Sequence, residues 1–467
     1  MSTLGIDLGT GSVKAAVVEP DGTIRAKASK AYAVESPRPG WAETDPESWL
    51  AAAHEVVAAA VVGQAPEAAS FSGQMHGVVV TDAGLRPLRP AILWADGRSV
   101  EQARALARDL TQDELSRLGS SAVTGFAATT LAWLLEHEPE VMAQAVHVLQ
   151  PKDWLRARLG GGIATDPSDA SGTLLYDVVA GDWSDRALAW AGIDRALLPP
   201  VVGSVDRVGS IRVGAVELPC AVGGADTACA LAGLGLVPGD GFVAVGSGSQ
   251  IVRVMDEPRL DGTLRTHTFA TVGAPGAGWY RIGAVQSAGL SLTAALAWLG
   301  ASVDEAAATL AGGVRADDPV FVPYLAGERT PFMDPGMRGS WHGLTLATDR
   351  TAMLRSILEG VAQAVALGVA AVQESGDPMP DVVPLVGGGT HDPAFRQLLA
   401  DASGLTLAVT DAPDSAVVGA ALLAGGLASN PRPPERTAVV TPQPTAMELL
   451  AGRRTRMVGL ATSREGT

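Results

Sequence analysis

A turn rich in glycine and hydroxyl residues follows the first apolar stretch of the chain. It lies in Gly5-Ile6-Asp7-Leu8-Gly9-Thr10-Gly11-Ser12-Val13-Lys14, where a predicted strand breaks into the turn and resumes as a second strand. Because glycines keep side chains out of the bend, backbone N–H groups and two hydroxyls can face one concave point. Such a turn suits the phosphates of a nucleotide, and Asp7 at the strand end suits a hydrated Mg²⁺. Plain hairpins have the same composition, so this turn alone does not decide between the two.

A second stretch of the same kind lies near the middle of the chain. Residues 241–245 are expected to form a strand, Gly246-Ser247-Gly248-Ser249 a turn, and residues 250–254 the return strand. Two strand–turn–strand units, one early and one near the middle, predict a duplicated architecture that holds phosphates between its halves.

A third glycine cluster, Gly387-Gly388-Gly389-Thr390, follows the apolar run 382–386. It precedes a helix that is expected to have Asp392 as its N-cap and Pro393 at its first position, and to end at Gly404. This strand–turn–helix unit could pack an adenosine against bare backbone. It lacks the lysine of a Walker A motif and the glycine spacing of a Rossmann fingerprint, which excludes both classes.

Asp226 is the candidate for chemistry on a substrate hydroxyl. It follows Gly223-Gly224-Ala225 and precedes an Ala- and Leu-rich helix, so its carboxylate lies at a strand-to-helix junction among small residues. Phosphorylation of a sugar hydroxyl needs a carboxylate within hydrogen-bond reach that takes the proton in line with the γ-phosphate. An N-cap aspartate is also common at such a junction, and the two roles are compatible.

Two polar clusters follow short apolar strands in the first part of the chain. One contains His76, which could donate a hydrogen bond to a hydroxylated substrate. The other contains Trp94 for stacking, Asp96 for hydroxyl groups and Arg98 to orient that carboxylate, a plausible sugar site. The alternatives are a turn histidine with satisfied hydrogen bonds and a surface tryptophan beside a salt bridge, and the residues alone leave them open.

The composition of the chain limits the kinds of protein and of partner that are expected. With 467 residues, 47% hydrophobic and 18% charged, the chain is expected to be globular with two domains. Its net charge of −16 argues against nucleic acid as a partner, and any phosphate site must rely on backbone dipoles and a metal ion. Cys220 and Cys229 are expected to be buried thiols, and the first residues lack a signal pattern, so a cytoplasmic location is predicted.

Several longer stretches are expected to build the scaffold. Residues 100–150 have a helical pattern, and the uncharged run 282–303 predicts a buried helix rather than a membrane span. An apolar stripe at helical spacing between residues 354 and 372 predicts a core helix. Residues 415–421 predict a helix of small residues that can abut a nucleotide or another helix, and residues 430–434 a linker.

These motifs resemble those of the FGGY carbohydrate kinases, and most closely those of the xylulokinase branch, over nearly the whole chain. The glycine turns are shared with chaperone- and actin-type ATPases, whereas GQMHG and SDASGTL are more specific to the xylulokinase branch. The matching segments are residues 5–10 (GIDLGT), 73–77 (GQMHG), 92–98 (ILWADGR), 151–155 (PKDWL), 168–174 (SDASGTL) and 324–331 (YLAGERTP).

The resemblance implies an α/β fold of two ribonuclease-H-like lobes, as in the actin-like ATPase superfamily, around a central cleft. It implies an N-terminal lobe at 1–222, a C-terminal lobe at 223–440 and a C-terminal tail at 441–467. The expected partners are a small sugar and ATP with Mg²⁺, without nucleic acid or membrane, and the expected oligomer is a homodimer. The implied reaction converts ATP and D-xylulose into ADP and D-xylulose 5-phosphate.

The resemblance also assigns roles by matching position. Asp226 would be the general base and would also contact the sugar, and Asp7 would serve the metal ion. The remaining implied site residues are Met75, His76, Trp94 and Asp96 for the ketose, Gly9, Thr10, Gly11, Ser12, Lys14, Gly246, Ser247, Gly248 and Ser249 for phosphate, and Gly388 and Gly389 for adenosine.

The chain departs from the family pattern at three places. Ala95 replaces an asparagine, which removes a polar contact near the sugar; Thr129-Thr130 replaces Pro-Lys; and residues 246–249 replace Gly-Thr-Ser-Gly. These departures leave the identity of the sugar open, so ribulose, a polyol or a deoxy sugar is the nearest alternative. A nucleotide-driven chaperone or filament protein and a weakly active sugar sensor are the alternatives from other classes.

Overall fold

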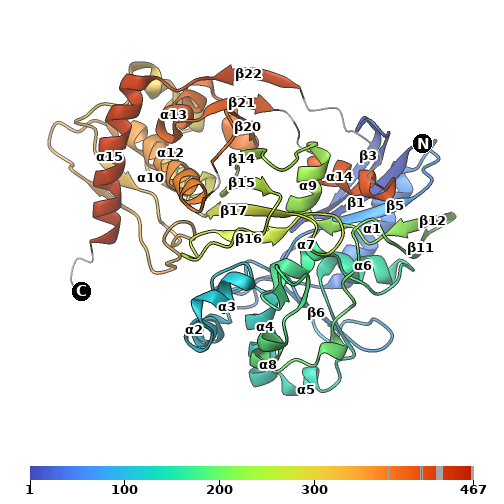
Figure 1. The fold of residues 1–467 in the computed structure, drawn as a ribbon. Coiled ribbons are helices and arrows are strands. Elements are labelled where there is room, and N and C mark those ends of the chain that lie inside the picture. The colour runs from blue at the N-terminus through green and yellow to red at the C-terminus, as the bar shows by residue number, and fades with distance from the viewer. Residues whose placement is uncertain (377, 411, 413, 427–434, 464–467) are drawn as a thin grey trace.

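The computed structural model describes the 467-residue chain except for residues 377, 411, 413, 427–434 and 464–467. Two lobes, each built on a mixed sheet, lie side by side, and a layer of short helices lies below them (Figure 1). The linker predicted at residues 430–434 lies outside the described residues.

The first sheet has the strand order β11-β12-β5-β1-β2-β3, with β13 paired to β5. β1 pairs antiparallel with β2 through the first glycine turn and parallel with β5. Its strands are β1 (Thr3–Leu8), β2 (Ser12–Val18), β3 (Ile24–Ala31), β5 (Ala69–Gly73), β11 (Arg207–Val213), β12 (Val216–Ala221) and β13 (Gly224–Ala225).

The second sheet repeats this order. β14 pairs antiparallel with β15 through the second glycine turn and parallel with β20, in the overall order β16-β17-β15-β14-β20-β21-β22. The duplication predicted from the two glycine turns is therefore confirmed. Its strands are β14 (Gly241–Val245), β15 (Ser249–Met255), β16 (His267–Ala270), β17 (Trp279–Val285), β20 (Val382–Val386), β21 (Thr406–Thr410) and β22 (Arg436–Val440).

The remaining strands form short pairs around the two sheets, and helices pack on both sheets. The short strands are β4 (Glu43–Thr44), β6 (Val79–Thr81), β7 (Ala91–Ile92), β8 (His147–Leu149), β9 (Tyr176–Asp177), β10 (Asp182–Trp183), β18 (Val320–Val322) and β19 (Ser340–His342). The helices are α1 (Pro46–Ala60), α2 (Val100–Asp109), α3 (Gln112–Arg117), α4 (Ala127–His137), α5 (Pro139–Met142), α6 (Pro151–Arg158), α7 (Pro167–Ala170), α8 (Asp185–Ala191), α9 (Asp226–Gly233), α10 (Gly289–Trp298), α11 (Val303–Ala308), α12 (Arg350–Glu374), α13 (Pro393–Ser403), α14 (Ser415–Ala424) and α15 (Pro444–Thr462).

Local signals explain where several of these helices begin and end. α1 starts where the Asp45 side chain accepts the Glu47 N–H, with Pro46 as its first residue. α13 starts in the same way at Asp392 and ends at Gly404 in the left-handed conformation, as predicted. α12 is long and apolar enough to cross a bilayer, but most of it is buried in the second lobe, which confirms the predicted core helix.

Helix α14 follows β21 late in the chain but packs on the first sheet. It lies against α9, β1 and β5, and Val417, Val418 and Leu422 join Ala16 and Val18 of β2 in one apolar cluster. The predicted small-residue helix therefore abuts another helix, α9. Because β13 also pairs with β5, the predicted division between residues 222 and 223 runs between two neighbouring strands of the first lobe.

The α9–α14 crossing yields a stability prediction. A Cβ atom added at Gly419 would lie 1.8 Å from the Cys229 carbonyl oxygen, so the backbones would have to separate. Gly419→Ala is therefore expected to lower the free energy of unfolding by about 3 kcal/mol, measured by denaturant unfolding. The control is Gly452→Ala in α15, where a Cβ meets open space; it should stabilise by up to about 1 kcal/mol. Equal stability of the two variants would contradict the tight crossing.

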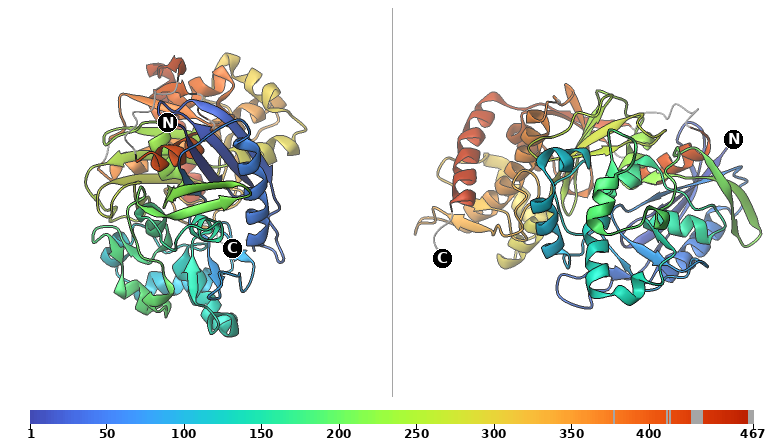
Figure 2. Two further views of the ribbon diagram at one scale, coloured as in Figure 1. Left: turned by 90° about the vertical axis from the view of Figure 1, so that its right-hand side faces the viewer. Right: turned by 60° about the horizontal axis from the view of Figure 1, so that its bottom comes forward.

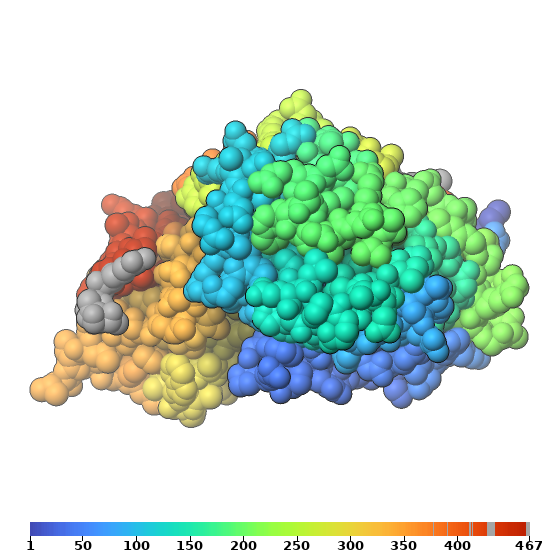
Figure 3. Space-filling model, turned by 90° about the horizontal axis from the view of Figure 1, so that it is seen from below, coloured from blue at the N-terminus to red at the C-terminus, as the bar shows by residue number. Residues whose placement is uncertain are grey.

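One hydrophobic cluster joins the lobes. It contains Phe126 and Leu174 from the helical layer and Phe242, Tyr280 and Ile282 from the second sheet. Seen from below, this layer fills the middle of the molecule in cyan to green, with the second lobe to its left (Figure 3). The right-hand view of Figure 2 shows α15, in red, at the outer end of the second lobe, away from the blue strands of the first sheet.

Three sequence predictions need correction or refinement. The uncharged run 282–303 is not one helix: β17 continues to Val285, and α10 begins only at Gly289. The helical pattern of residues 100–150 breaks into α2 to α5 and ends in strand β8. The segment 441–467, set apart as a tail, contains α15, whose Arg453 forms a buried ion pair with Glu359 of α12.

Candidate active site

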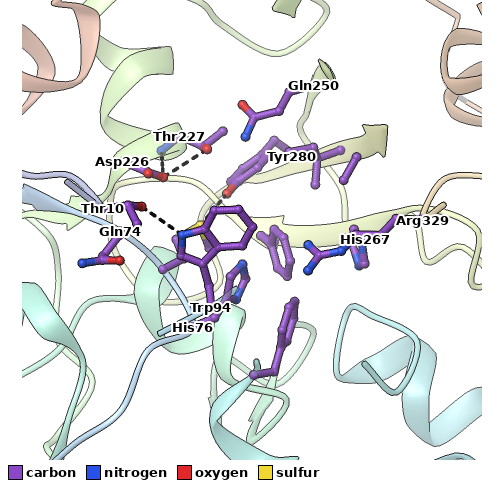
Figure 4. A pocket seen from close by; sticks show the side chains of 15 residues that line it. Thr10, Gln74, His76, Trp94, Asp226, Thr227, Gln250, His267, Tyr280 and Arg329 are labelled. Atoms are coloured by element: carbon purple, nitrogen blue, oxygen red, sulfur yellow. Dashed lines mark hydrogen bonds between the residues drawn. The ribbon is translucent and has the colours of Figure 1, made fainter. Parts of the chain in front are cut away.

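A cavity of about 170 Å³ lies between the lobes. The first lobe contributes Thr10 from the first glycine turn, Met75 and His76 after β5, and Trp94 after β7; Asp226 opens α9. The second lobe contributes side chains from β15, β16, β17 and the loop after β18 (Figure 4). The structure thus brings together Asp226, Met75, His76 and Trp94, which were assigned to the sugar, with Thr10, which was assigned to phosphate.

Asp226 is the first residue of α9, and the N-cap position belongs to Ala225. One carboxylate oxygen, Oδ1, accepts the Thr227 N–H at 2.6 Å and the Thr227 hydroxyl at 3.2 Å. Burial, together with the nearby Asp7 carboxylate, raises the pKa of Asp226 to about 6. A carboxyl group with a pKa close to neutrality is suited to accept a proton from a substrate hydroxyl.

Asp7 lies at the end of β1, close enough to Asp226 for their charges to interact. Its Oδ1 is buried and has no hydrogen-bond partner among the described residues, and burial raises the pKa of Asp7. A buried carboxylate oxygen without a partner fits a cation. Mg²⁺ is typically held in proteins by one or two carboxylates, water and phosphate oxygens, so one such carboxylate can serve it.

His76 presents an acceptor rather than the predicted donor. Its Nδ1 lies 2.5 Å from the carbonyl oxygen of Gly172, and because a carbonyl only accepts, Nδ1 carries the proton. The ring stacks on Phe126 with 3.8 Å between ring centroids. Burial lowers the pKa of His76 to about 3, so the imidazole is neutral and Nε2 is its acceptor. The backbone of His76 lies in the left-handed region, with a φ of 73°.

Of the two residues expected to contact the sugar in the second polar cluster, Trp94 lines the cavity and Asp96 does not. The Trp94 indole lines the cavity and donates from Nε1 to the Thr10 hydroxyl at 2.9 Å. Asp96 is not among the lining residues: its carboxylate accepts the Ala42 N–H at 2.6 Å and pairs with Arg98 at 2.8 Å. Both Asp96 oxygens accept hydrogen bonds that hold the loop carrying Trp94, so the sugar contact expected of Asp96 stays a prediction. Ala95 is exposed and also lies outside the lining.

The PKDWL and SDASGTL segments, together with Asp166 just before the second of them, form a buried ionic cluster. The ammonium of Lys152 lies 2.7 Å from Asp153, 3.2 Å from Asp166 and 3.2 Å from Asp169. Ser168 donates to Asp166 at 2.5 Å and accepts the N–H of Ala225 at 2.9 Å, one residue before the base. These segments therefore support the backbone that carries Asp226.

The first glycine turn is closed by its own backbone. The Gly9 N–H donates to the Ser12 carbonyl at 3.0 Å, and a Cβ at Gly11 would meet nothing. Ser12 is partly exposed at the start of β2. Lys14 is not among the residues that line the cavity, and its ammonium pairs with Asp414, just before α14, at 3.5 Å.

In the second glycine turn, Gly246, Ser247 and Gly248 are at least partly exposed. Ser249 is buried and donates to the Ala244 carbonyl at 2.7 Å, so its hydroxyl serves the turn itself.

The third glycine cluster and the threonine pair complete the predicted positions. Gly387 has a φ of 104°, and the exposed backbone at Gly388 has open space where a side chain would stand. Gly389 is exposed as well, but a Cβ there would lie 3.0 Å from Val245. Thr129, which with Thr130 replaces Pro-Lys, is buried in the first turn of α4 and donates to the Phe126 carbonyl at 3.1 Å.

Sequence reasoning missed the far side of the cavity. Gln250, His267, Tyr280 and Arg329 line it, from β15, β16, β17 and the loop after β18. Arg329 lies in the YLAGERTP segment, which matched the family pattern without a role being assigned to any of its side chains. His267 and Tyr280 stand in ordinary strand patterns, and only the pairing of β16 with β17 brings them to the site.

Known proteins share this architecture over the whole chain. Residues 2–233 match the N-terminal domain and residues 245–428 the C-terminal domain of the FGGY family of carbohydrate kinases. The chain is 34% identical to the xylulose kinase of Escherichia coli (strain K12) over 452 residues, which covers 93% of this chain and 91% of that protein.

Solved structures agree with the fold. The crystal structure of xylulose kinase from Rhodospirillum rubrum has a TM-score of 0.87 and 26% identity, with 98% of each chain covered. A gluconate kinase from Lactobacillus acidophilus has a TM-score of 0.91 at 22% identity, again over 98% of each chain, and shares the fold. The predicted two-lobed fold of the actin-like ATPase type is therefore confirmed.

Proposed function

Because this chain belongs to the FGGY family of carbohydrate kinases, we propose that its substrate is a ketopentose, D-xylulose, and that it forms D-xylulose 5-phosphate and ADP from ATP. The observation that carries this proposal is the half-buried Asp226 carboxylate, with a pKa of about 6, in a small cavity ringed by polar and aromatic side chains. The similarity to xylulose kinases over most of the chain supports the choice of sugar.

The chemistry follows from the position of Asp226. Its carboxylate takes the proton of the C5 hydroxyl while that oxygen attacks the γ-phosphorus of ATP, and the bond to the β-phosphate oxygen breaks to release ADP. Trp94 and His76 orient the sugar carbons, one by its indole face and the other by accepting a hydroxyl proton at Nε2. The neighbouring Thr227 holds Asp226 by two hydrogen bonds, so the base is oriented before the sugar arrives.

Asp7 and the glycine turns would serve the nucleotide. Asp7 would hold Mg²⁺, which when bound neutralises charge on the phosphate oxygens. The exposed backbone of the two glycine turns would donate to those oxygens, and the open backbone at Gly388 and Gly389 would face the adenosine. Approach of the two lobes over both substrates would exclude water from the γ-phosphate, which keeps ATP hydrolysis slow.

We also place the reaction in the cytoplasm and the chain in a homodimer. The proposed boundary near residue 222 separates the segment that carries the first glycine turn from the segment that carries the second, and α14 of the later segment returns to the first sheet. The oligomeric state is measured by sedimentation of the purified protein.

A substrate panel tests the proposed function. ADP release with Mg-ATP is measured with D-xylulose, D-ribulose, L-ribulose, L-xylulose, glycerol, gluconate and no sugar. D-Xylulose is expected to have the highest kcat/KM, with little ADP formed in the absence of sugar. A higher kcat/KM for any other compound would replace D-xylulose as the substrate while the kinase chemistry stands.

The pH dependence follows from the pKa of Asp226. Since the base must be unprotonated, and burial raises its pKa to about 6, kcat/KM for the sugar should fall as the pH drops through 6. Well below that pH the expected loss is about tenfold per pH unit. Steady-state kinetics between pH 5 and 8 measure this limb. A profile that stays flat down to pH 5 would contradict Asp226 as the base.

A further inference from the structure

The side of the cavity across from Asp226 carries a cation that the proposed mechanism does not use. Figure 4 shows Arg329 and His267 together on this side, and Asp226, Thr10 and Gln74 on the other. The Arg329 guanidinium lies over the Trp94 ring, 5.8 Å from its centroid. Among the described residues, no carboxylate forms an ion pair with it.

The neighbouring Glu328 does not neutralise this cation directly. Its Oε1 accepts the N–H groups of Gln286 at 2.6 Å and Arg329 at 2.8 Å, and its Oε2 accepts the Ser287 N–H at 3.2 Å. Both carboxylate oxygens are thus used to fasten the loop to the end of β17. Thr330 adds a pair of hydrogen bonds with Ala284, at 2.9 and 3.0 Å. The loop is therefore fixed on the second sheet, and the Arg329 side chain projects into the cavity.

His267 is an acceptor beside this donor. The Ser120 hydroxyl donates its only proton to the Ser121 carbonyl oxygen, at 2.9 Å. The same hydroxyl oxygen lies 2.8 Å from Nδ1 of His267, so it must accept a hydrogen bond there, and Nδ1 of His267 carries the proton. Nε2 of His267 is then left as an acceptor, as in His76. Burial, with the Arg329 charge in addition, lowers the pKa of His267 to about 3. Arg329, which only donates, is thus accompanied by two neutral imidazoles that can only accept at Nε2.

We propose that Arg329 and His267 determine specificity for the ketose end of the substrate, an inference that rests on the proposed function. With the C5 hydroxyl at Asp226, the C1–C2 end of an open-chain pentulose reaches the opposite side. A C2 carbonyl oxygen only accepts, which matches Arg329, and the C1 hydroxyl can donate to Nε2 of His267. A pentitol has a hydroxyl at C2 in place of the carbonyl. The oxygen of that hydroxyl can accept from Arg329, but its proton meets only donors there, so the pentitol gains less binding free energy from Arg329 and His267 than the ketose does.

The test compares D-xylulose with xylitol, used as a competitive inhibitor, on Arg329→Met. Methionine keeps an apolar side chain against Trp94 and removes the donors. The KM for D-xylulose is expected to rise about 100-fold, whereas the Ki of xylitol and the KM of ATP change less than about threefold. Arg338→Met is the matched control, because Arg338 is exposed in the same loop and should leave all three constants unchanged. Equal losses for D-xylulose and xylitol would overturn the inference.

A second variant keeps the test independent of folding effects at Arg329. His267→Phe retains an aromatic ring next to Phe269, which now stacks with His267 at 5.7 Å, but lacks Nε2. It should raise the KM for D-xylulose about tenfold. An unchanged KM would remove His267 from the proposal. Failure of the proposed function looks different: the wild-type protein itself would then phosphorylate no ketopentose.

Discussion

Asp226→Asn is expected to lower kcat for sugar phosphorylation by about 10³-fold, because asparagine cannot take the proton of the attacking hydroxyl. The substitution keeps the size of the side chain and an oxygen that can accept from Thr227, which now donates at 2.6 Å. The binding of D-xylulose, measured by titration calorimetry, should therefore change little. Single-turnover kinetics with saturating ATP and sugar measure the chemical step.

The control for this variant removes an equal charge far from the cavity. Asp304→Asn on α11 changes an exposed aspartate and should leave kcat unchanged. An Asp226→Asn protein with wild-type kcat would show that another group accepts the proton. Loss of sugar binding together with kcat would show instead that the substitution had disturbed the cavity.

Asp7→Asn is expected to lower kcat by about 10²-fold or more and to raise the concentration of free Mg²⁺ needed for half-maximal activity. The buried Oδ1 of Asp7 has no hydrogen-bond partner among the described residues. A neutral amide at this position therefore removes the negative charge that would attract the cation and does not replace it. Steady-state rates, measured at a fixed concentration of Mg-ATP while free Mg²⁺ is varied, separate the loss of kcat from the higher Mg²⁺ requirement. An unchanged Mg²⁺ requirement would exclude Asp7 as a metal ligand.

The same variant has a second readout with a definite sign. The Asp7 carboxylate raises the pKa of Asp226, so its removal should lower that pKa. The acidic limb of kcat/KM is then expected to move to lower pH in Asp7→Asn, although the rates themselves are smaller. A limb that moves to higher pH would contradict the interaction between the two carboxylates.

Local signals in the sequence were sufficient for most of the scaffold. The glycine turns after β1 and β14 lie between apolar strands, and both hairpins could be predicted from that pattern. The start of α13 at Asp392-Pro393 and its end at Gly404 could be predicted from the residue types at those positions. The run 282–303 was misassigned because it carries no charge in either its strand or its helix. Where β17 ends is decided by its pairing with β15, which local composition does not contain.

For the candidate site, too, local position predicted some residues, whereas contacts between distant segments could not be predicted. Asp7, Asp226 and the segment around His76 stand at strand ends, where position alone indicates a ligand. The partners of a side chain, in contrast, come from distant parts of the chain. Asp96 is saturated by Arg98 and Ala42, and Lys14 is held by Asp414, four hundred residues away in sequence. Arg329 and its neighbours were missed for the same reason, since they reach the cavity only through the second sheet.

The most direct test of the account is the transfer of the γ-phosphoryl group itself. ATP, Mg²⁺ and D-xylulose are incubated with the protein, and the phosphorylated product is identified by ³¹P and ¹H nuclear magnetic resonance. The account predicts one sugar product, phosphorylated on the C5 oxygen, in amounts equal to the ADP formed. ADP formed at the same rate without sugar, or a phosphate on another oxygen, would contradict it.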